Sequence, residues 1–94
     1  LSDSVLADLA DAVQTVQFAA GSVVFSVGDV GTAFYMILRG GVVCKDIADG
    51  SADVTLGPGD YFGELALLRE APRAATVEVT EPDTECLVLN SAEF

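Results

Sequence analysis

Short apolar runs separated by glycine-rich turns make up the chain from Gln17 onward. These runs are rich in β-branched and aromatic residues and occupy positions 23–25, 34–38, 42–44, 54–56 and 86–89. Between residues 75 and 80, apolar and polar residues alternate, which is the period of a half-buried strand. Many short strands at close, even spacing predict a mainly β domain built as an antiparallel sandwich or barrel.

Glycines mark the turns between these runs. We expect them to allow backbone conformations with positive φ, which other residues rarely adopt. The positions are Gly28, Gly31, Gly40, Gly57 and Gly59. A polar hairpin through Asp49-Gly50-Ser51 joins the runs at 42–44 and 54–56.

The two ends of the chain follow a helical pattern instead. Near the N-terminus, apolar residues recur at helical spacing with Asp8 and Asp11 on the opposite face, which predicts a short amphipathic helix. The apolar set is Val5, Leu6, Leu9, Ala12, Val13 and Val16. At the other end, residues 90–94 (NSAEF) are typical of a cap followed by the first residues of a helix.

A further short helix is predicted between two strands, at residues 63–68 (GELALL). These residues are good helix formers, and Pro72 limits how far such a helix can extend. A helix of little more than one turn adds little stability, because helix nucleation is unfavourable. Its free N–H groups and the dipole at its start do, however, favour an anion, so we expect the helix to serve a ligand.

Arg73 stands out because the chain carries only four basic residues against fifteen acidic ones. Its planar guanidinium suits phosphate oxygens. Glu64 offers a carboxylate to hydroxyl donors, and Gly63 has no side chain to keep a ligand from the backbone. Together these residues describe a pocket for a ribose that carries a phosphate. The alternative is a surface arginine in an ion pair with Glu70 or Glu78, an interaction worth only ~0–1 kcal/mol.

Composition narrows the possible functions further. Ninety-four residues with 51% apolar content predict one packed domain, residues 1–94, and no apolar run approaches the ~20 residues of a membrane span. The net charge of −11 argues against binding nucleic acid or an anionic membrane. The chain has no histidine, the commonest general base and transition-metal ligand, so we predict no catalytic and no metal-binding residue. Cys44 and Cys86 are expected to be reduced, half-buried thiols of a cytoplasmic protein, with a disulfide as the alternative.

The segment FGELALL, a spacer and then PRAATV resembles the phosphate-binding cassette of cyclic-nucleotide-binding domains. The resemblance is greatest to the regulatory domains of the cAMP- and cGMP-dependent protein kinases. The earlier segments GDVGTAFYMILRGG and GPGDYFG also resemble the glycine pattern of this family, so the likeness covers nearly the whole chain. It implies a double-stranded β-helix, the jelly-roll-like β-roll of the family, with a short phosphate-binding helix between strands.

The resemblance also implies roles for individual residues. Glu64 would accept a hydrogen bond from the ribose 2′-hydroxyl, and Arg73 would pair with the cyclic phosphate. The rest of the site would be lined by Gly63, Leu65, Ala66, Ala74 and Ala75. In cGMP-selective members the residue after the arginine is often threonine or serine, whereas here it is Ala74, so the resemblance implies cAMP as the preferred ligand and cGMP as the other candidate. No cofactor is implied.

The likeness implies a regulatory module that controls an effector domain of the same chain or a partner subunit such as a kinase. Members of the family usually carry helices after the roll that cover the base, and we expect this chain, which ends at Phe94, to lack that lid. In kinase relatives a strand residue near Val43 is often acidic and braces the arginine, a role that Val43 does not fill. Two alternatives stand beside this interpretation: a roll that has lost its ligand and acts as a docking module, and an enzyme on a cupin-like roll, which the absence of histidine disfavours.

Overall fold

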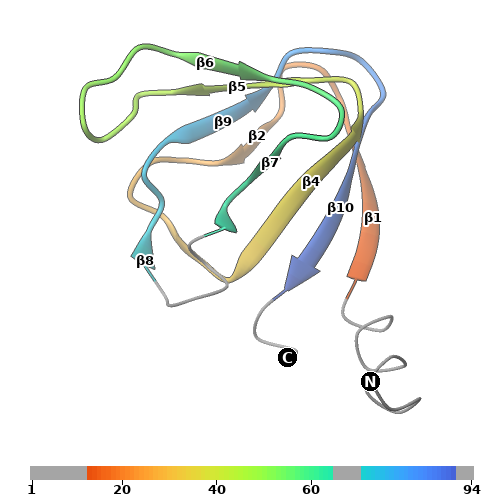
Figure 1. The fold of residues 1–94 in the computed structure, drawn as a ribbon, viewed down its shortest axis with the longest axis horizontal. Helices are drawn as coiled ribbons and strands as arrows, with labels where there is room; N and C mark the ends of the chain where they lie inside the picture. Colours follow the sequence, from red (N-terminus) through yellow and green to blue (C-terminus); the bar gives the residue numbers. More distant parts are fainter. Residues whose placement is uncertain (1–12, 65–70, 91–94) are drawn as a thin grey trace.

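The described part of the chain folds into ten antiparallel strands, arranged in two four-stranded sheets and one two-stranded ribbon (Figure 1). The computed structural model describes residues 13–64 and 71–90. The strands are β1 (Val13–Phe18), β2 (Val23–Phe25), β3 (Val30–Gly31), β4 (Ala33–Arg39), β5 (Val42–Lys45), β6 (Val54–Leu56), β7 (Tyr61–Phe62), β8 (Ala71–Pro72), β9 (Thr76–Val79) and β10 (Thr84–Asn90). The predicted mainly β roll is confirmed.

The first sheet has the strand order β1-β10-β4-β7. Strand β10 lies between β1 and β4, so the last strand of the chain pairs with the first, from Val13 opposite Leu89 to Phe18 opposite Thr84. Figure 1 shows these long strands running side by side. One edge of the sheet is β1, and the other is the two-residue strand β7, which pairs with Tyr35 and Met36 of β4.

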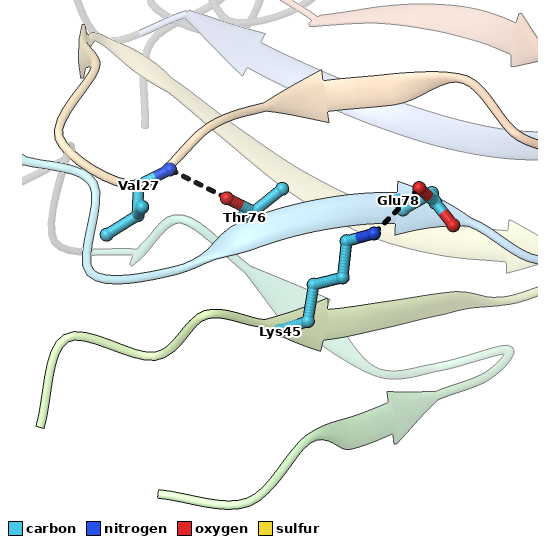
Figure 2. Close-up of polar contacts among 4 residues, drawn as sticks. All are labelled: Val27, Lys45, Thr76 and Glu78. Carbon is cyan, nitrogen blue, oxygen red and sulfur yellow. Dashed lines mark hydrogen bonds and ion pairs between the residues drawn. The ribbon is translucent and has the colours of Figure 1, made fainter. Parts of the chain in front are cut away.

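The second sheet has the order β2-β9-β5-β6, and the hairpin of β5 and β6 forms its outer edge. Strand β9 joins β2 to β5, so it brings segments from three parts of the chain together. Across this sheet the Lys45 ammonium on β5 forms an ion pair of 2.9 Å with the Glu78 carboxylate on β9 (Figure 2). The two-stranded ribbon pairs β3 with β8, with Val30 opposite Pro72 and Gly31 opposite Ala71.

The hydrophobic core lies between the two sheets. Its buried members are Ile37, Val42, Phe62, Val77, Val79 and Cys86. Three aromatic rings extend the core toward the ribbon: Tyr35 stacks on Phe62 with centroids 5.0 Å apart, and Phe25 contacts both at 6.0 and 5.9 Å. The alternation of each strand directs these side chains inward, which is why the apolar runs of the sequence become the faces of the core.

Most predicted strands match the structure, with one clear error at the N-terminal side. Val13 and Val16 were assigned to a helix and instead lie in β1. The spacing of these two valines fits a helix, but β1 alternates in burial toward its end and pairs with β10 along its whole length, so tertiary pairing overrides the local period. The predicted helix at residues 5–12 and the helix start at 91–94 lie outside the described residues, and Asn90 itself ends β10.

The structure also tests the predicted state of the two cysteines and the predicted conformation of the turn glycines. Cys44 on β5 and Cys86 on β10 are both free thiols, the first half-buried and the second fully buried. Gly28, Gly40 and Gly59 have positive φ as predicted, whereas Gly31 and Gly57 do not, so that part of the prediction is wrong. No helix within residues 13–64 and 71–90 is long and apolar enough to cross a membrane.

Candidate functional site

The backbone of Arg73 is fixed to the loop that follows β2. Its N–H donates to the Asp29 carbonyl at 2.6 Å, and its carbonyl accepts from the Gly28 N–H at 2.9 Å. A few residues on, the hydroxyl of Thr76 accepts a hydrogen bond of 3.0 Å from the Val27 N–H (Figure 2). The loop at 26–29 and the segment that enters β9 therefore hold each other, and Arg73 lies at the centre of this arrangement.

The Arg73 side chain is buried, with only 8% of its surface exposed. Its Nη2 donates to the Ala33 carbonyl at 3.0 Å, and its Cζ lies 4.2 Å from the centroid of the Phe25 ring, a cation–π contact. Its Nε is buried and has no hydrogen-bond partner within residues 13–64 and 71–90. Among the described residues the guanidinium has no carboxylate partner, because the ion pair found there joins Lys45 to Glu78. A buried cation without a counter-ion is costly, so this arrangement calls for an anion.

Gly63 leaves room for the guanidinium, because it has no side chain. A Cβ atom built on Gly63 would lie 2.9 Å from Nη1 of Arg73 and 3.0 Å from the Ala33 carbonyl. Gly63 also has a φ of 79°, in the left-handed region that favours glycine. The sequence therefore needs glycine at position 63 for two independent reasons, its conformation and its contact with the arginine.

A cavity of about 170 Å³ opens beside the guanidinium. It is lined by Phe25, Cys44, Phe62, Gly63, Glu64, Pro72, Arg73, Ala74, Ala75 and Val77. Its lining combines apolar side chains, several of them from the core, with the charged side chains of Glu64 and Arg73, which form no ion pair with each other. A cavity with an apolar body and a few convergent polar groups is typical of a small-molecule site.

Glu64 is exposed, directly follows Gly63 and has a 3₁₀-helical conformation. Its carboxylate is close enough to Cys44 to influence the thiol across the cavity. Burial raises the pKa of the Cys44 thiol above its ordinary value, and the negative charge of Glu64 raises this pKa further. The thiol is therefore protonated at neutral pH, and a protonated thiol is a poor nucleophile.

Five of the seven residues that the sequence assigned to the site line this one cavity. They are Gly63, Glu64, Arg73, Ala74 and Ala75. The other two, Leu65 and Ala66, lie outside the described residues, as does most of the predicted helix at 63–68. The alternative in which Arg73 forms a surface ion pair with Glu78 is wrong, because Arg73 is buried and Glu78 pairs with Lys45. Glu70, the other partner considered for that ion pair, lies outside the described residues.

The sequence analysis missed the residues that hold the arginine in place. Phe25 stacks on the guanidinium, Ala33 accepts its hydrogen bond, and Gly31 leaves room for it. All three precede Arg73 by 40 residues or more, so no local pattern around the arginine reveals them. The glycine at position 31 was noticed, but it was attributed to a turn.

Comparison with known proteins agrees with this architecture. The family model described as cyclic nucleotide-binding domain matches residues 15–94. The chain is 50% identical over 70 residues to a cAMP-dependent protein kinase regulatory subunit of Schizosaccharomyces pombe, which covers 74% of this chain and 17% of the relative. It is 36% identical over 99 residues to the cGMP-dependent protein kinase, isozyme 1, of Drosophila melanogaster, which covers 100% of this chain and 13% of the relative.

Two solved structures share the fold over nearly the whole chain. The regulatory domain of Toxoplasma gondii PKA, crystallised with cAMP, has a TM-score of 0.74 and 34% identity, and the match covers 93% of this chain and 34% of that chain. The catabolite activator protein of Thermus thermophilus has a TM-score of 0.77 and 31% identity, with 99% of this chain and 45% of that chain covered. The chain therefore spans less than half the length of each of these four proteins.

Proposed function

Because this chain belongs to the cyclic nucleotide-binding domain family, we propose that its cavity binds a cyclic nucleotide through Arg73 and Glu64. The observation that carries the proposal is the burial of Arg73, a residue that is only 8% exposed. Among the described residues its buried Nε has no hydrogen-bond partner, and its guanidinium has no carboxylate beside it. A cyclic phosphate supplies the missing negative charge and acceptor oxygens. Charge-assisted hydrogen bonds of this kind are about twice as strong as neutral ones.

The remaining parts of the nucleotide follow from the shape of the cavity. The carboxylate of Glu64 accepts a hydrogen bond from the ribose 2′-hydroxyl, since it is the acidic side chain that lines the cavity among the described residues. The apolar wall, with Val77 and Ala75, contacts the less polar parts of the ligand. The backbone of Gly63, Leu65, Ala66, Ala74 and Ala75 completes the set of binding residues that we propose.

We propose cAMP as the preferred ligand over cGMP. The residue after the arginine is Ala74, which has no hydroxyl to offer to the guanine base. A site that hydrogen-bonds a specific group rejects ligands that lack the matching group, whereas a small apolar residue does not select for guanine. The preference therefore depends on the absence of a polar contact at position 74.

The domain acts as a regulatory module, and residues 1–94 form that one unit. Its relatives are much longer chains, including kinase regulatory subunits and a protein titled Rap guanine nucleotide exchange factor 3 from Homo sapiens. Ligand binding at this roll controls an effector, either in the same chain or in a partner subunit. The size of that control is limited by how differently the two states of the domain bind the nucleotide.

The test is calorimetric titration with cAMP and with cGMP. We expect saturable binding of cAMP to the unmodified chain and a loss of about tenfold to a hundredfold in affinity for Arg73→Ala, which is the effect of removing a charge-assisted pair worth ~1.5–3 kcal/mol. Arg39→Ala is the matched control, since it removes the same charge from an exposed side chain that contacts the Asp83 carbonyl outside the cavity.

Three outcomes contradict parts of this proposal. Equal losses of cAMP affinity in Arg73→Ala and Arg39→Ala would mean that Arg73 acts only through the overall charge of the protein. Tighter binding of cGMP would overturn the argument from Ala74. The absence of heat with either nucleotide would favour a roll that serves as a docking module.

A further inference from the structure

Gly31 is a glycine whose conformation does not require glycine. Its φ is not in the positive region, and strand β3, which it ends, is regular enough to pair with β8. The reason for glycine at this position lies in its surroundings instead. A Cβ atom built on Gly31 would lie 2.5 Å from Nη2, 3.0 Å from Nε and 3.1 Å from Cζ of Arg73.

The guanidinium thus occupies a slot, which we define by Phe25, Gly31, Ala33 and Gly63. The Phe25 ring supports the face of the guanidinium, the Ala33 carbonyl accepts from Nη2, and the two glycines leave space along Nη2 and Nη1. Three of these residues come from the segment between β2 and β4, far from Arg73 in sequence. The slot therefore determines where the guanidinium lies before any ligand arrives.

We propose that Gly31 is a positioning residue of the nucleotide site, whose missing side chain fixes the place of the Arg73 guanidinium. This inference rests on the proposed function for its effect on affinity, but the slot itself exists without a ligand. A methyl group at position 31 displaces the guanidinium from Phe25 and Ala33. The displaced arginine no longer presents its donors where the cyclic phosphate binds.

The same geometry predicts that the fold survives the substitution. The three heavy atoms nearest to such a methyl group all belong to the far end of a flexible side chain, which can move without shifting the backbone. Gly63 offers no comparable test, because its φ of 79° makes any substitution strained wherever the arginine lies. Gly31→Ala thus separates the position of the guanidinium from backbone strain.

Gly57→Ala is the matched control. Gly57 also lacks a positive φ and is also half-buried, and a Cβ built there meets nothing within 4 Å. The two variants therefore make the same chemical change at positions that both lack a positive φ, although Gly31 ends a strand and Gly57 precedes a turn. They differ in whether the new methyl group meets the guanidinium.

The first measurement uses the ligand-free protein and the ¹H–¹⁵N signal of the Arg73 Nε–H group, assigned by its loss in Arg73→Ala. In the unmodified chain and in Gly57→Ala we expect a signal shifted by the Phe25 ring and slow to exchange with water, because this nitrogen is buried. In Gly31→Ala the signal should move toward that of a free arginine and exchange faster. An unchanged signal in Gly31→Ala would overturn the inference, whatever the nucleotide does.

The second measurement is a double-mutant cycle of cAMP affinity. We expect Gly31→Ala to weaken binding at least about tenfold, the effect of disturbing a charge-assisted hydrogen bond, and to have no further effect in a chain that already carries Arg73→Ala. Additive losses would show that Gly31 acts independently of the arginine and would overturn the inference. If the unmodified chain binds no nucleotide, the proposed function fails, and the Nε–H signal still decides the role of Gly31.

The unfolding of the same variants completes the test. Gly31→Ala should keep its far-ultraviolet circular dichroism and a cooperative thermal transition, like Gly57→Ala. A Gly31→Ala chain that does not fold would contradict the inference that the flexible guanidinium yields first. If Gly31 instead mattered only for the β3–β8 ribbon, Gly31→Ala would lower the stability of the chain by the same amount with and without Arg73→Ala.

Discussion

The guanidinium of Arg73 is withdrawn from water and rests on an aromatic ring, a carbonyl and two glycines. The ring and the carbonyl compensate part of its charge, and the buried Nε has no hydrogen-bond partner among the described residues. Leaving a polar group of this kind without a partner costs about 1–3 kcal/mol. The proposed phosphate therefore meets an arginine whose conformational freedom has already been lost, which favours binding.

The role proposed for Glu64 predicts that the site discriminates against a ligand without the ribose 2′-hydroxyl. Removing either the carboxylate or the 2′-hydroxyl should delete the same hydrogen bond, so the unmodified chain should bind cAMP about tenfold more tightly than 2′-deoxy-cAMP. Glu64→Ala should bind both nucleotides with nearly equal affinity. Calorimetric titration of the two proteins with the two ligands measures this coupling.

Glu81→Ala is a suitable control for that experiment. Glu81 is an exposed carboxylate outside the residues that line the cavity, so its removal lowers the negative charge by the same amount. It should leave the preference for the 2′-hydroxyl intact. If Glu64→Ala still discriminated against the 2′-deoxy ligand as strongly as the unmodified chain, the assigned role of Glu64 would be wrong.

At this scale the sequence revealed the residues of the site that are close together along the chain. The order Gly63, Glu64, Arg73, Ala74, Ala75 is a local pattern, and the structure brings all five to one cavity. Phe25, Gly31 and Ala33 could not be found in the same way, because their relation to Arg73 exists only after β2, β3 and β4 have folded around it. Cys44 was identified as half-buried, but its place on the cavity wall depends on the register of β5 against β9.

At the scale of elements, the loop at 26–29 holds the backbone of Arg73 in place through hydrogen bonds. It is closed on itself by the Ser26 N–H, which donates to the Asp29 carboxylate at 2.9 Å, and it is tied to both sides of Arg73 through Asp29 and Gly28. Thr76 supplies a further attachment, from the first residue of β9 to Val27. The position of the loop and the position of Arg73 are therefore coupled.

Thr76→Val should loosen this loop while keeping the shape of the side chain. The Val27 N–H loses its acceptor, so we expect a loss of about 0.5–1.5 kcal/mol in the free energy of unfolding. The amide of Val27 should also exchange with deuterium faster than in the unmodified chain. Urea denaturation and amide hydrogen exchange measure the two effects.

Thr55→Val is the comparison for this change. Thr55 is an exposed residue of β6, so the same substitution should change the free energy of unfolding by less than about 0.5 kcal/mol. Faster exchange at Val27 in both variants would mean that the loop responds to general loss of stability. It would then be incorrect to regard Thr76 as its attachment.

The elements also differ in how well the sequence predicts them. The strands β2 and β6 begin and end as expected, because each is a short apolar run between turn residues. β1 was mistaken for part of a helix, since two valines three residues apart suit either structure. β7 and β8 are only two residues long, and pairing with β4 and β3 defines them, so no local signal could identify them.

For the molecule as a whole, three buried acids predict how stability depends on alkaline pH. Burial raises the pKa of Cys44 and of Cys86 above the ordinary value of 9.0, and the pKa of Tyr35 above 10.0, although the charge of Arg73 opposes the shift for Tyr35. The folded chain therefore holds these protons more tightly than the unfolded chain does. Their contribution to stability is fully present below pH 9 and is lost as the pH rises through the folded pKa values.

We expect the free energy of unfolding in urea to fall steadily from pH 9 to pH 10.5. The variant with both Cys44→Ala and Cys86→Ala should be less stable at pH 7, because a buried side chain is truncated, but it should lose less stability over the same pH range. An equal or steeper fall in the double variant would show that the thiols do not carry this dependence.

The pairing of β1 with β10 brings the two ends of the roll close together. Val13 and Leu89 are direct neighbours across two antiparallel strands, so their Cα atoms lie about 5 Å apart. The chain enters and leaves the roll at one corner, as Figure 1 shows for the two strands. Such a unit can be spliced into a host protein, or duplicated in tandem, without pulling the flanking segments apart. The pairing of β1 with β10 thus allows the roll, with the nucleotide site proposed for it, to be inserted into different proteins.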